Sequence, residues 1–430
     1  MTTWSIAPSG RWLLHGGEPT FLLADTVWAA FGGPTENEWL DHLELRRRQG
    51  FNALLISVLP IEHDRSTGTR SPYALRDGAV DFGAGDPDYW TEAERLLEQA
   101  RERGFTPMLV LLWNNFVPGT WGSRLTPEHV LSADQTETYV RETVARFRRF
   151  DPIWIVSGDD DLDDDVALER YSSVAALLRE VAPGQLVTWH DTPTARMPQP
   201  LADSELVDFH ALQSGHNEAW DTLPADLTHD YRALDVARPI INLEPCYEGL
   251  GRFRGAARHS AADVRRASWT GVVSGAAAGL GYGAHGVWSW HRRGEGFSAE
   301  DVHGAPFPFS VAAAFPGADD VAYLRRVVDA ERLWGLDAAP DLLVAEPSGA
   351  VTGRAPDGTI AVYAPTPFAL TLVLGDVEAA GLEVTVHDLA ARRPDAARWT
   401  AVDGGIRLEQ PEFTGDALFV LRPARSGGER

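Results

Sequence analysis

Two acidic segments hold the residue types that general acid–base chemistry needs. The segment IVSGDDDLDDD (155–165) follows an apolar run and contains six aspartates. In the segment INLEPCYEG (241–249), Glu244 ends another apolar run. A carboxyl group that emerges from an apolar run is open to burial, and burial raises its pKa so that it can act as an acid. The first segment alone is compatible with a catalytic carboxylate, a cation site or the solvated start of a helix.

The elements that must position these residues alternate between apolar runs and amphipathic stretches. A helix capped by Thr35 and ended by Gly50 follows the first run, and similar stretches separate most of the others. This pattern predicts a (β/α)₈ barrel, since a doubly wound sheet usually has fewer strands and a glycine-rich turn after the first. The eight predicted strands are 21–25, 51–59, 105–113, 152–158, 185–190, 206–213, 238–244 and 283–290.

The pattern changes after the segment 319–335, which is predicted to be the last barrel helix. Short β-rich runs with turns and no helix then predict a small antiparallel β-sandwich. The sequence thus predicts two domains, a catalytic barrel over 1–335 and a sandwich over 336–430. The runs are 342–347, 358–365, 369–376, 382–389 and 416–423.

The carboxyl ends of the barrel strands are the expected place for function. The residues there are carboxylates, amides, imidazoles and indoles, which hydrogen-bond hydroxyl groups or stack on sugar rings. Almost no cation ends a strand, so a neutral carbohydrate is the expected substrate, although tryptophans can also plug the barrel mouth. The candidate substrate-binding residues are Asp25, Trp28, Trp113, Asn114, His190, Gln213, His216, Tyr247, Trp288 and Trp290.

Asp159 and Glu244 end strands four and seven, which face each other across a barrel mouth. Glycoside hydrolysis needs one protonated acid and one ionised carboxylate on either side of the scissile bond, so this pair predicts that reaction. The alternatives are a helix N-cap at Asp159 and a structural ion pair at Glu244. Asp160 and Asp161 are second candidates if the strand ends later, and Asp163 to Asp165 are predicted in the first turn of the next helix.

Composition removes several function classes. The 430 residues include no lysine, which excludes Schiff-base enzymes and P-loop nucleotide binding, and the single Cys246 excludes an internal disulfide. A net charge of -24 opposes nucleic acid and anionic membranes. No EF-hand or HExxH spacing is present, so we predict no metal and no cofactor, with a calcium ion on Asp160 to Asp165 left open. The N-terminus lacks a signal-peptide pattern, which predicts a cytoplasmic protein.

Several segments together resemble the apiosidase-like family of glycoside hydrolases: GRWLLHGGEPTFLLADTVWAAF, RRRQGFNALLISVLP, IWIVSGD, LQSGH, INLEPCYEG and VRRASWTGVVSGAAAGLGYGAHGVWSW. The C-terminal region is similar to the domain, labelled collagen-binding, that often follows this barrel. The resemblance implies a retaining enzyme with Asp159 as acid/base and Glu244 as nucleophile. Ser157 departs from the glycine common in the family, and a carboxyl separation above about 6.5 Å would indicate inversion. Family substrates include apiose-containing pectin side chains.

We therefore predict a glycoside hydrolase that acts on a small oligosaccharide or glycoside. The alternative is a non-catalytic carbohydrate-binding protein on a degenerate barrel. A barrel lyase or isomerase usually needs a metal cluster or a lysine base, and neither is visible in the sequence. The loops 60–85, 114–133 and 191–204 are expected to determine which sugar is bound.

Overall fold

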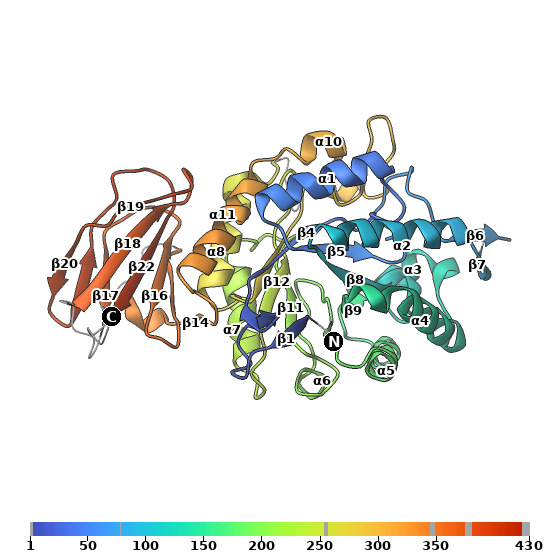
Figure 1. The fold of residues 1–430 in the computed structure, drawn as a ribbon, viewed down its shortest axis with the longest axis horizontal. Coiled ribbons are helices and arrows are strands. Elements are labelled where there is room, and N and C mark those ends of the chain that lie inside the picture. Colours follow the sequence, from blue (N-terminus) through green and yellow to red (C-terminus); the bar gives the residue numbers. More distant parts are fainter. Residues whose placement is uncertain (1–2, 78, 253–256, 345–348, 375–380, 424–430) are drawn as a thin grey trace.

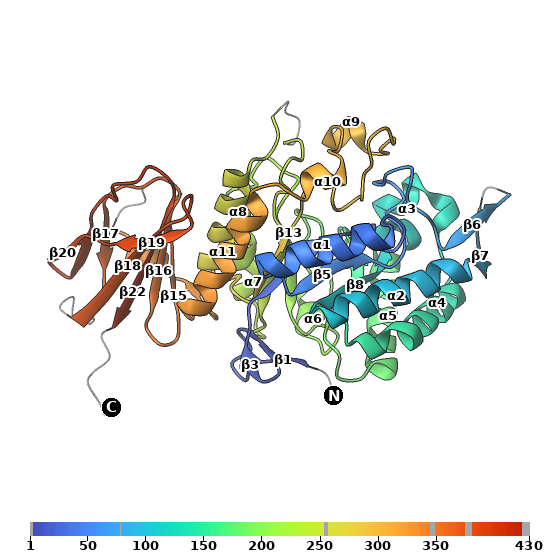
Figure 2. The same ribbon diagram turned by 45° about the horizontal axis from the view of Figure 1, so that its top comes forward.

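The computed structural model of the chain describes residues 3–77, 79–252, 257–344, 349–374 and 381–423. A barrel wrapped in helices lies beside a smaller β-sandwich, and helices α8 (Ala261–Val273) and α11 (Gly317–Ala330) lie between them (Figures 1 and 2). Within the described ranges, no helix is long and apolar enough to cross a membrane.

The barrel is a parallel sheet of eight strands in the order β10-β9-β8-β5-β4-β13-β12-β11. The two end strands also meet, because the Asp208 N–H donates to the Val187 carbonyl at 2.9 Å and a parallel bridge pairs His190 with Ala211. The sheet is therefore closed, and the predicted (β/α)₈ barrel is confirmed. The strands are β4 (Leu22–Thr26), β5 (Ala53–Ser57), β8 (Thr106–Trp113), β9 (Ile153–Gly158), β10 (Val187–Thr188), β11 (His210–Gln213), β12 (Ile240–Glu244) and β13 (Gly279–Tyr282).

Every residue of these strands is buried, as expected for a parallel sheet covered on both faces. The outer helices are α1 (Glu36–Gln49), α2 (Pro87–Glu102), α4 (Ala133–Phe147), α5 (Asp165–Val181), α6 (Gln199–Ala202), α7 (Leu223–Arg232), α8 and α11. Helix α1 begins after the N-cap Thr35 and ends at Gly50, whose φ of 88° is accessible to glycine at little cost. Both boundaries agree with the sequence prediction.

The eighth strand was predicted at 283–290, and this position is wrong. The strand is the glycine-rich segment GLGY at Gly279–Tyr282. A Cβ atom on Gly281 would lie 1.9 Å from the Leu243 carbonyl oxygen, so the two strands can approach only with glycine there. Trp288 and Trp290 consequently belong to the loop that follows the strand rather than to the strand itself.

The sandwich consists of two antiparallel sheets, as predicted. The larger has the order β14 (Asp337–Ala338), β15 (Val351–Arg354), β16 (Ile360–Ala364), β22 (Ala417–Pro423), β18 (Leu382–Asp388), β19 (Arg393–Ala396). The smaller has the order β17 (Leu370–Val373), β21 (Gly405–Leu408), β20 (Trp399–Val402). The first predicted β-rich run, 342–347, does not begin as a strand, because Leu342 is the last residue of a 3₁₀ turn. Residues 345–347 of this run lie outside the described ranges.

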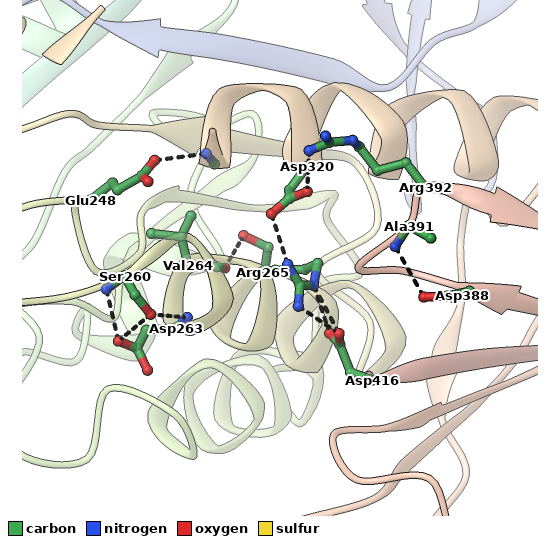
Figure 3. A network of polar contacts seen from close by, with 12 residues as sticks. Glu248, Ser260, Asp263, Val264, Arg265, Asp320, Asp388, Ala391, Arg392 and Asp416 are labelled. Carbon is green, nitrogen blue, oxygen red and sulfur yellow. Dashed lines mark hydrogen bonds and ion pairs between the residues drawn. The ribbon is translucent and has the colours of Figure 1, made fainter. Parts of the chain in front are cut away.

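A buried ionic network joins the barrel to the sandwich (Figure 3). Arg265 of α8 lies 2.8 Å from Asp320 of α11 and 2.7 Å from Asp416, which precedes β22. Arg392, between β18 and β19, contacts the other oxygen of Asp320 at 2.9 Å. The side chains of Arg265, Asp320 and Asp416 are at most 12% exposed, so these charges are held by one another rather than by water.

Candidate active site

A cavity of about 550 Å³ opens at the carboxyl ends of the barrel strands. Eight of the residues predicted from the sequence line it, and they come from strands or loops spread around the barrel. These residues are Trp28, Trp113, Asp159, Gln213, His216, Glu244, Tyr247 and Trp288. The structure thus brings both candidate catalytic carboxyl groups to one cavity.

Glu244 is the last residue of β12 and is 5% exposed. Its two carboxylate oxygens face two imidazoles: Oε1 lies 2.7 Å from His216 Nε2, and Oε2 lies 2.9 Å from His190 Nε2. Burial alone would raise the pKa of Glu244, but the hydrogen bonds and charges of His190 and His216 outweigh it and hold the pKa well below its usual range. Glu244 is therefore an ionised carboxylate at the cavity floor.

His190 connects the two candidate catalytic residues. The backbone N–H of Asp159 donates to His190 Nδ1 at 3.3 Å, so Nδ1 is an acceptor and the ring proton resides on Nε2, facing Glu244. Ser157 fixes the same residue, because its Oγ accepts from the His190 N–H at 3.0 Å and donates to the His190 carbonyl at 3.1 Å. The serine that departs from the family pattern thus ties β9 to the segment that carries His190.

Asp159 follows β9 directly and has a positive φ of 53°, which aspartate tolerates better than most residues. The preceding Gly158 has room only for hydrogen, since a Cβ atom there would lie 2.3 Å from the ring of Trp113. Asn114 Nδ2 donates to the Asp159 carbonyl at 2.5 Å and supports the turn. The local backbone is thus set by a glycine, a tryptophan and an asparagine around the carboxyl group.

The two carboxyl groups differ in their protonation. Burial and, after it, repulsion by Glu244 raise the pKa of Asp159 to about 6, against the weaker opposing effects of His190, His216 and Gln213. Glu244 has its pKa lowered by the same two histidines. Below about pH 6, Asp159 mostly retains its proton while Glu244 is ionised, which is the division of roles that acid-assisted glycoside cleavage requires.

Three of the predicted substrate-binding residues do not line the cavity. Asp25 is fully buried and pairs with His42 at 2.6 Å and Arg46 at 3.0 Å, which fixes α1 against β4.

Trp290 is buried with its ring stacked on Phe309 at 5.1 Å. Asn114 is also fully buried and contacts the Asp159 backbone, as described above. A fourth residue, His190, lies behind Glu244 and not on the cavity wall.

Three of the remaining aspartates of the 155–165 segment have structural contacts, and Asp163 and Asp165 are exposed. Asp164 is the N-cap of α5 and its carboxylate accepts from the backbone N–H groups of Val166 and Ala167. Asp160 accepts from the Leu162 N–H at 3.1 Å, and Asp161 accepts from the Thr192 hydroxyl at 2.7 Å. Over the described part of the chain, no three His, Cys, Asp or Glu side chains are grouped to hold a metal ion.

Sequence reasoning missed the loop residues of the cavity. Asp64 and His63 lie beyond β5, Trp121 begins the short helix α3 (Trp121–Leu125), and His303 ends α9 (Glu300–His303). The one available signal was the polar pair His63-Asp64 in the loop 60–85, which was expected to influence the bound sugar. Their distance from the strand ends, seven residues for Asp64 beyond Ser57, kept them out of a prediction based on strand ends.

Several buried polar atoms on the cavity wall have no hydrogen-bond partner among the described residues. They include both donors and acceptors, and burying such atoms without a partner is costly unless a ligand satisfies them. Among these atoms are Asp64 Oδ1, Trp113 Nε1, Gln213 Oε1, His216 Nδ1 and Trp288 Nε1. A ligand with many hydroxyl groups, each able to donate and accept, matches this mixture.

Known structures share this architecture. A protein described as a glycoside hydrolase is 19% identical and superposes with a TM-score of 0.81 over 99% of this chain and 98% of its own. A glycoside hydrolase family 5 protein from Bacteroides vulgatus ATCC 8482 is also 19% identical, with a TM-score of 0.81 over 98% of this chain and 93% of its own. At such identity the similarity concerns the fold. No curated protein matches the chain at a significant level.

The class and the family follow from these findings. The protein is a glycoside hydrolase, because its sequence matches a family of glycoside hydrolases, its fold is theirs, and two carboxyl groups lie in one cavity. Residues 7–335 match the profile described as apiosidase-like, catalytic domain. The chain belongs to this apiosidase-like family, and the resemblance seen in the sequence motifs is confirmed.

Proposed function

We propose that the protein hydrolyses a small, neutral glycoside or oligosaccharide by a two-carboxylate mechanism with retention of configuration. The observation that carries the proposal is the pairing of Asp159 and Glu244 in one cavity with opposite pKa shifts. Residues 1–335 form the catalytic domain in this proposal, and residues 336–430 form the sandwich domain that supports it.

Each residue has a role that its contacts support. Ionised Glu244, oriented by His190 and His216, attacks the anomeric carbon and forms a glycosyl-enzyme ester. Asp159 donates its proton to the leaving oxygen and then, as a carboxylate, takes a proton from the water that cleaves the ester. Trp28, Trp113 and Trp288 present aromatic surface to the sugar ring. Gln213 and His216 offer polar atoms to its hydroxyl groups.

The proposal is tested with a panel of 4-nitrophenyl glycosides of pentoses and hexoses, including apiosides and other pentofuranosides. Wild-type protein should release nitrophenol from at least one, and ¹H NMR should show the product first in the anomeric form of the substrate. Asp159→Ala should lose activity, and added azide should restore turnover by trapping the glycosyl-enzyme as a glycosyl azide. Initial release of the opposite anomer would replace retention with inversion.

The non-catalytic alternative makes a different prediction for the same panel. If no glycoside is cleaved while oligosaccharides quench the tryptophan fluorescence of the cavity equally in wild type and Asp159→Ala, the barrel binds carbohydrate without hydrolysing it. The four tryptophans that line the cavity make this optical readout possible, and they are Trp28, Trp113, Trp121 and Trp288.

A further inference from the structure

The cavity contains a third carboxyl group that the two-carboxylate reaction does not use. Asp64, in the loop after β5, lines the same cavity as Asp159 and Glu244, and its side chain is 17% exposed. Its Oδ2 lies 3.6 Å from His303 Nε2, while its Oδ1 is buried and has no hydrogen-bond partner within the described ranges. One oxygen of this group is thus available to a bound molecule.

Among the described residues that line the cavity, Asp64 has no permanently charged cationic partner. None of the described residues that line the cavity is an arginine, and the chain has no lysine. Burial lowers the pKa of His303 to about 3, so this neighbour is neutral. Burial and the charges of Asp159 and Glu244 raise the pKa of Asp64 well above its usual range. A neutral carboxyl group offers one O–H donor and one carbonyl acceptor. It can therefore form hydrogen bonds with sugar hydroxyl groups, which both donate and accept.

We propose that Asp64 is a specificity-determining residue whose carboxyl group binds and orients a hydroxyl group of the sugar in the cavity. This inference rests on the proposed glycosidase function. It assigns Asp64 to recognition and leaves bond cleavage to Asp159 and Glu244. Substitution should therefore affect the affinity for the sugar more than the chemical step.

The experiment compares Asp64→Ala and Asp64→Asn by titrating tryptophan fluorescence with free monosaccharides and by measuring kcat and KM on the best 4-nitrophenyl glycoside. Asp64→Ala should weaken binding of the preferred monosaccharide about tenfold. Asp64→Asn should stay within about threefold of wild type, since an amide also offers a donor and an acceptor. In a series of analogues that each lack one hydroxyl group, the analogue without the hydroxyl bound by Asp64 should bind wild type about tenfold more weakly than the parent sugar. Asp64→Ala should bind this analogue as well as wild type does, because the contact is already absent.

The control and the contrary outcomes are specific. Glu62→Gln changes a carboxylate of the same loop that contacts Arg65 at 3.0 Å and does not line the cavity, and it should leave sugar binding unchanged. Additive losses for every deoxy analogue would overturn the proposal. A fall in kcat beyond about a thousandfold in Asp64→Asn would do so as well, because it would make Asp64 the acid. The fluorescence titrations measure sugar binding without any turnover, so failure of the hydrolase proposal is recognised separately from failure of this one.

An independent observation concerns the opening of the cavity. Leu125 is 62% exposed and Val302 is 65% exposed, and across the described residues these are the two most exposed large apolar side chains. Both line the cavity, together with the partly exposed Trp121 and Pro193. The four residues come from three separate segments, helix α3, helix α9 and the loop that carries Pro193, so the apolar character belongs to the opening and not to one helix.

We infer that the opening binds an apolar aglycone, so that the substrate class is a neutral glycoside of an aromatic or alkyl alcohol. This second inference also rests on the proposed function. Glu244 is buried at the inner end of the cavity, whereas Leu125 and Val302 are exposed at its opening, so a leaving group bound beyond the sugar would meet apolar side chains. An acidic polysaccharide would lack a cation to pair with, since no arginine of the described residues lines the cavity.

Non-hydrolysable thioglycosides test this inference without turnover. With the preferred sugar held constant, a phenylethyl thioglycoside should bind about tenfold more tightly than the methyl thioglycoside when each is titrated against tryptophan fluorescence. The Leu125→Ser/Val302→Ser double variant should lose this advantage, whereas Leu75→Ser, which alters a leucine that is 59% exposed and away from the cavity, should retain it. Equal affinity of wild type for both compounds, or a difference in affinity that survives the double variant, would overturn the inference.

Discussion

Two groups of buried carboxyl groups in this protein have opposite surroundings. At the barrel mouth, both carboxylate oxygens of Glu244 face histidines, and among the described residues the positive charges that act on Asp159 are those of the same two imidazoles. At the junction with the sandwich, Asp320 and Asp416 are held by Arg265, and Arg392 adds a second guanidinium (Figure 3). Arginine is always charged, so it locks a carboxylate in one state, whereas histidine orients a carboxylate and leaves proton transfer open. The cationic residue beside a buried carboxylate, arginine or histidine, therefore determines whether that carboxylate is structural or reactive.

The largest expected effect is on catalysis. Glu244→Gln should lower kcat/KM by on the order of 10⁴-fold, because it removes the nucleophile while keeping the side-chain shape. Glu248→Gln, four residues later, is the matched control. Its carboxylate accepts from Tyr282 at 2.7 Å and from the Gly317 N–H at 2.8 Å and does not line the cavity, so kcat/KM should stay within about threefold of wild type. Initial rates on the best aryl glycoside measure both, and equal losses would contradict the assignment.

The next effect is on the stability of the interface. Arg265→Leu should reduce the free energy of unfolding by about 3 to 5 kcal/mol, because Asp320 and Asp416 would remain buried without their shared cation. Urea unfolding followed by circular dichroism measures this change. Arg266→Leu removes an exposed pair with Asp221 and should cost less than about 1 kcal/mol. The kcat/KM of folded Arg265→Leu should equal that of wild type, and a loss there would link the two sites.

A smaller effect has the opposite sign in the two regions. The folded state holds the Asp159 proton up to about pH 6, against a usual pKa of 3.8, so ionisation at higher pH opposes folding. Asp159→Asn should therefore raise the free energy of unfolding by about 2 kcal/mol at pH 8, after allowance for solvent in the cavity, and by nothing at pH 3.5. Asp416→Asn should instead lower it at pH 8, because Arg265 loses a charged partner. Urea unfolding at both pH values measures these changes. If the free energy of unfolding changed in the same direction in both variants at pH 8, the contrast between the two regions would be wrong.

The last expectation concerns the pH dependence of the reaction. Because the free enzyme needs protonated Asp159 and ionised Glu244, kcat/KM should fall about tenfold per pH unit above pH 6. The acidic limb should lie far lower, since the pKa of Glu244 is held down by its histidines. Steady-state rates between pH 4 and 9 record the profile. In Asp159→Asn the residual activity should not show the fall near pH 6, and an unchanged limb would assign it to another group.

The sequence predicted the barrel well because buried parallel strands are nearly continuous apolar runs, and seven of them were found at the right places. The eighth was misplaced because its strand is made of Gly279 to Tyr282, where close approach of Leu243 demands glycine and removes the apolar signal. The aromatic residues after it looked more like a strand. The periodicity of a sequence reflects the polarity of its side chains, and it does not indicate where two backbones approach each other closely.

The site was predicted in part for a related reason. Strand ends located Asp159 and Glu244 in one cavity, but a strand end does not say which way a side chain points. Asp25 is next to the last residue of β4 and yet pairs with His42 and Arg46 of the following helix. Asp64 was missed because a long loop returns it to the cavity from beyond the strand. Such a return depends on tertiary packing that no local pattern encodes.

The arginine shared across the junction has a consequence for how such proteins evolve. Recombination that exchanged the segment after residue 335 would remove Asp416 and Arg392 and leave Arg265 and Asp320 in the barrel with altered neighbours. A foreign C-terminal segment would need a carboxylate at the same point to be accepted. Exchange of the sandwich alone should therefore cost stability in the barrel as well, because Arg265 belongs to the barrel and one of its two carboxylates belongs to the sandwich.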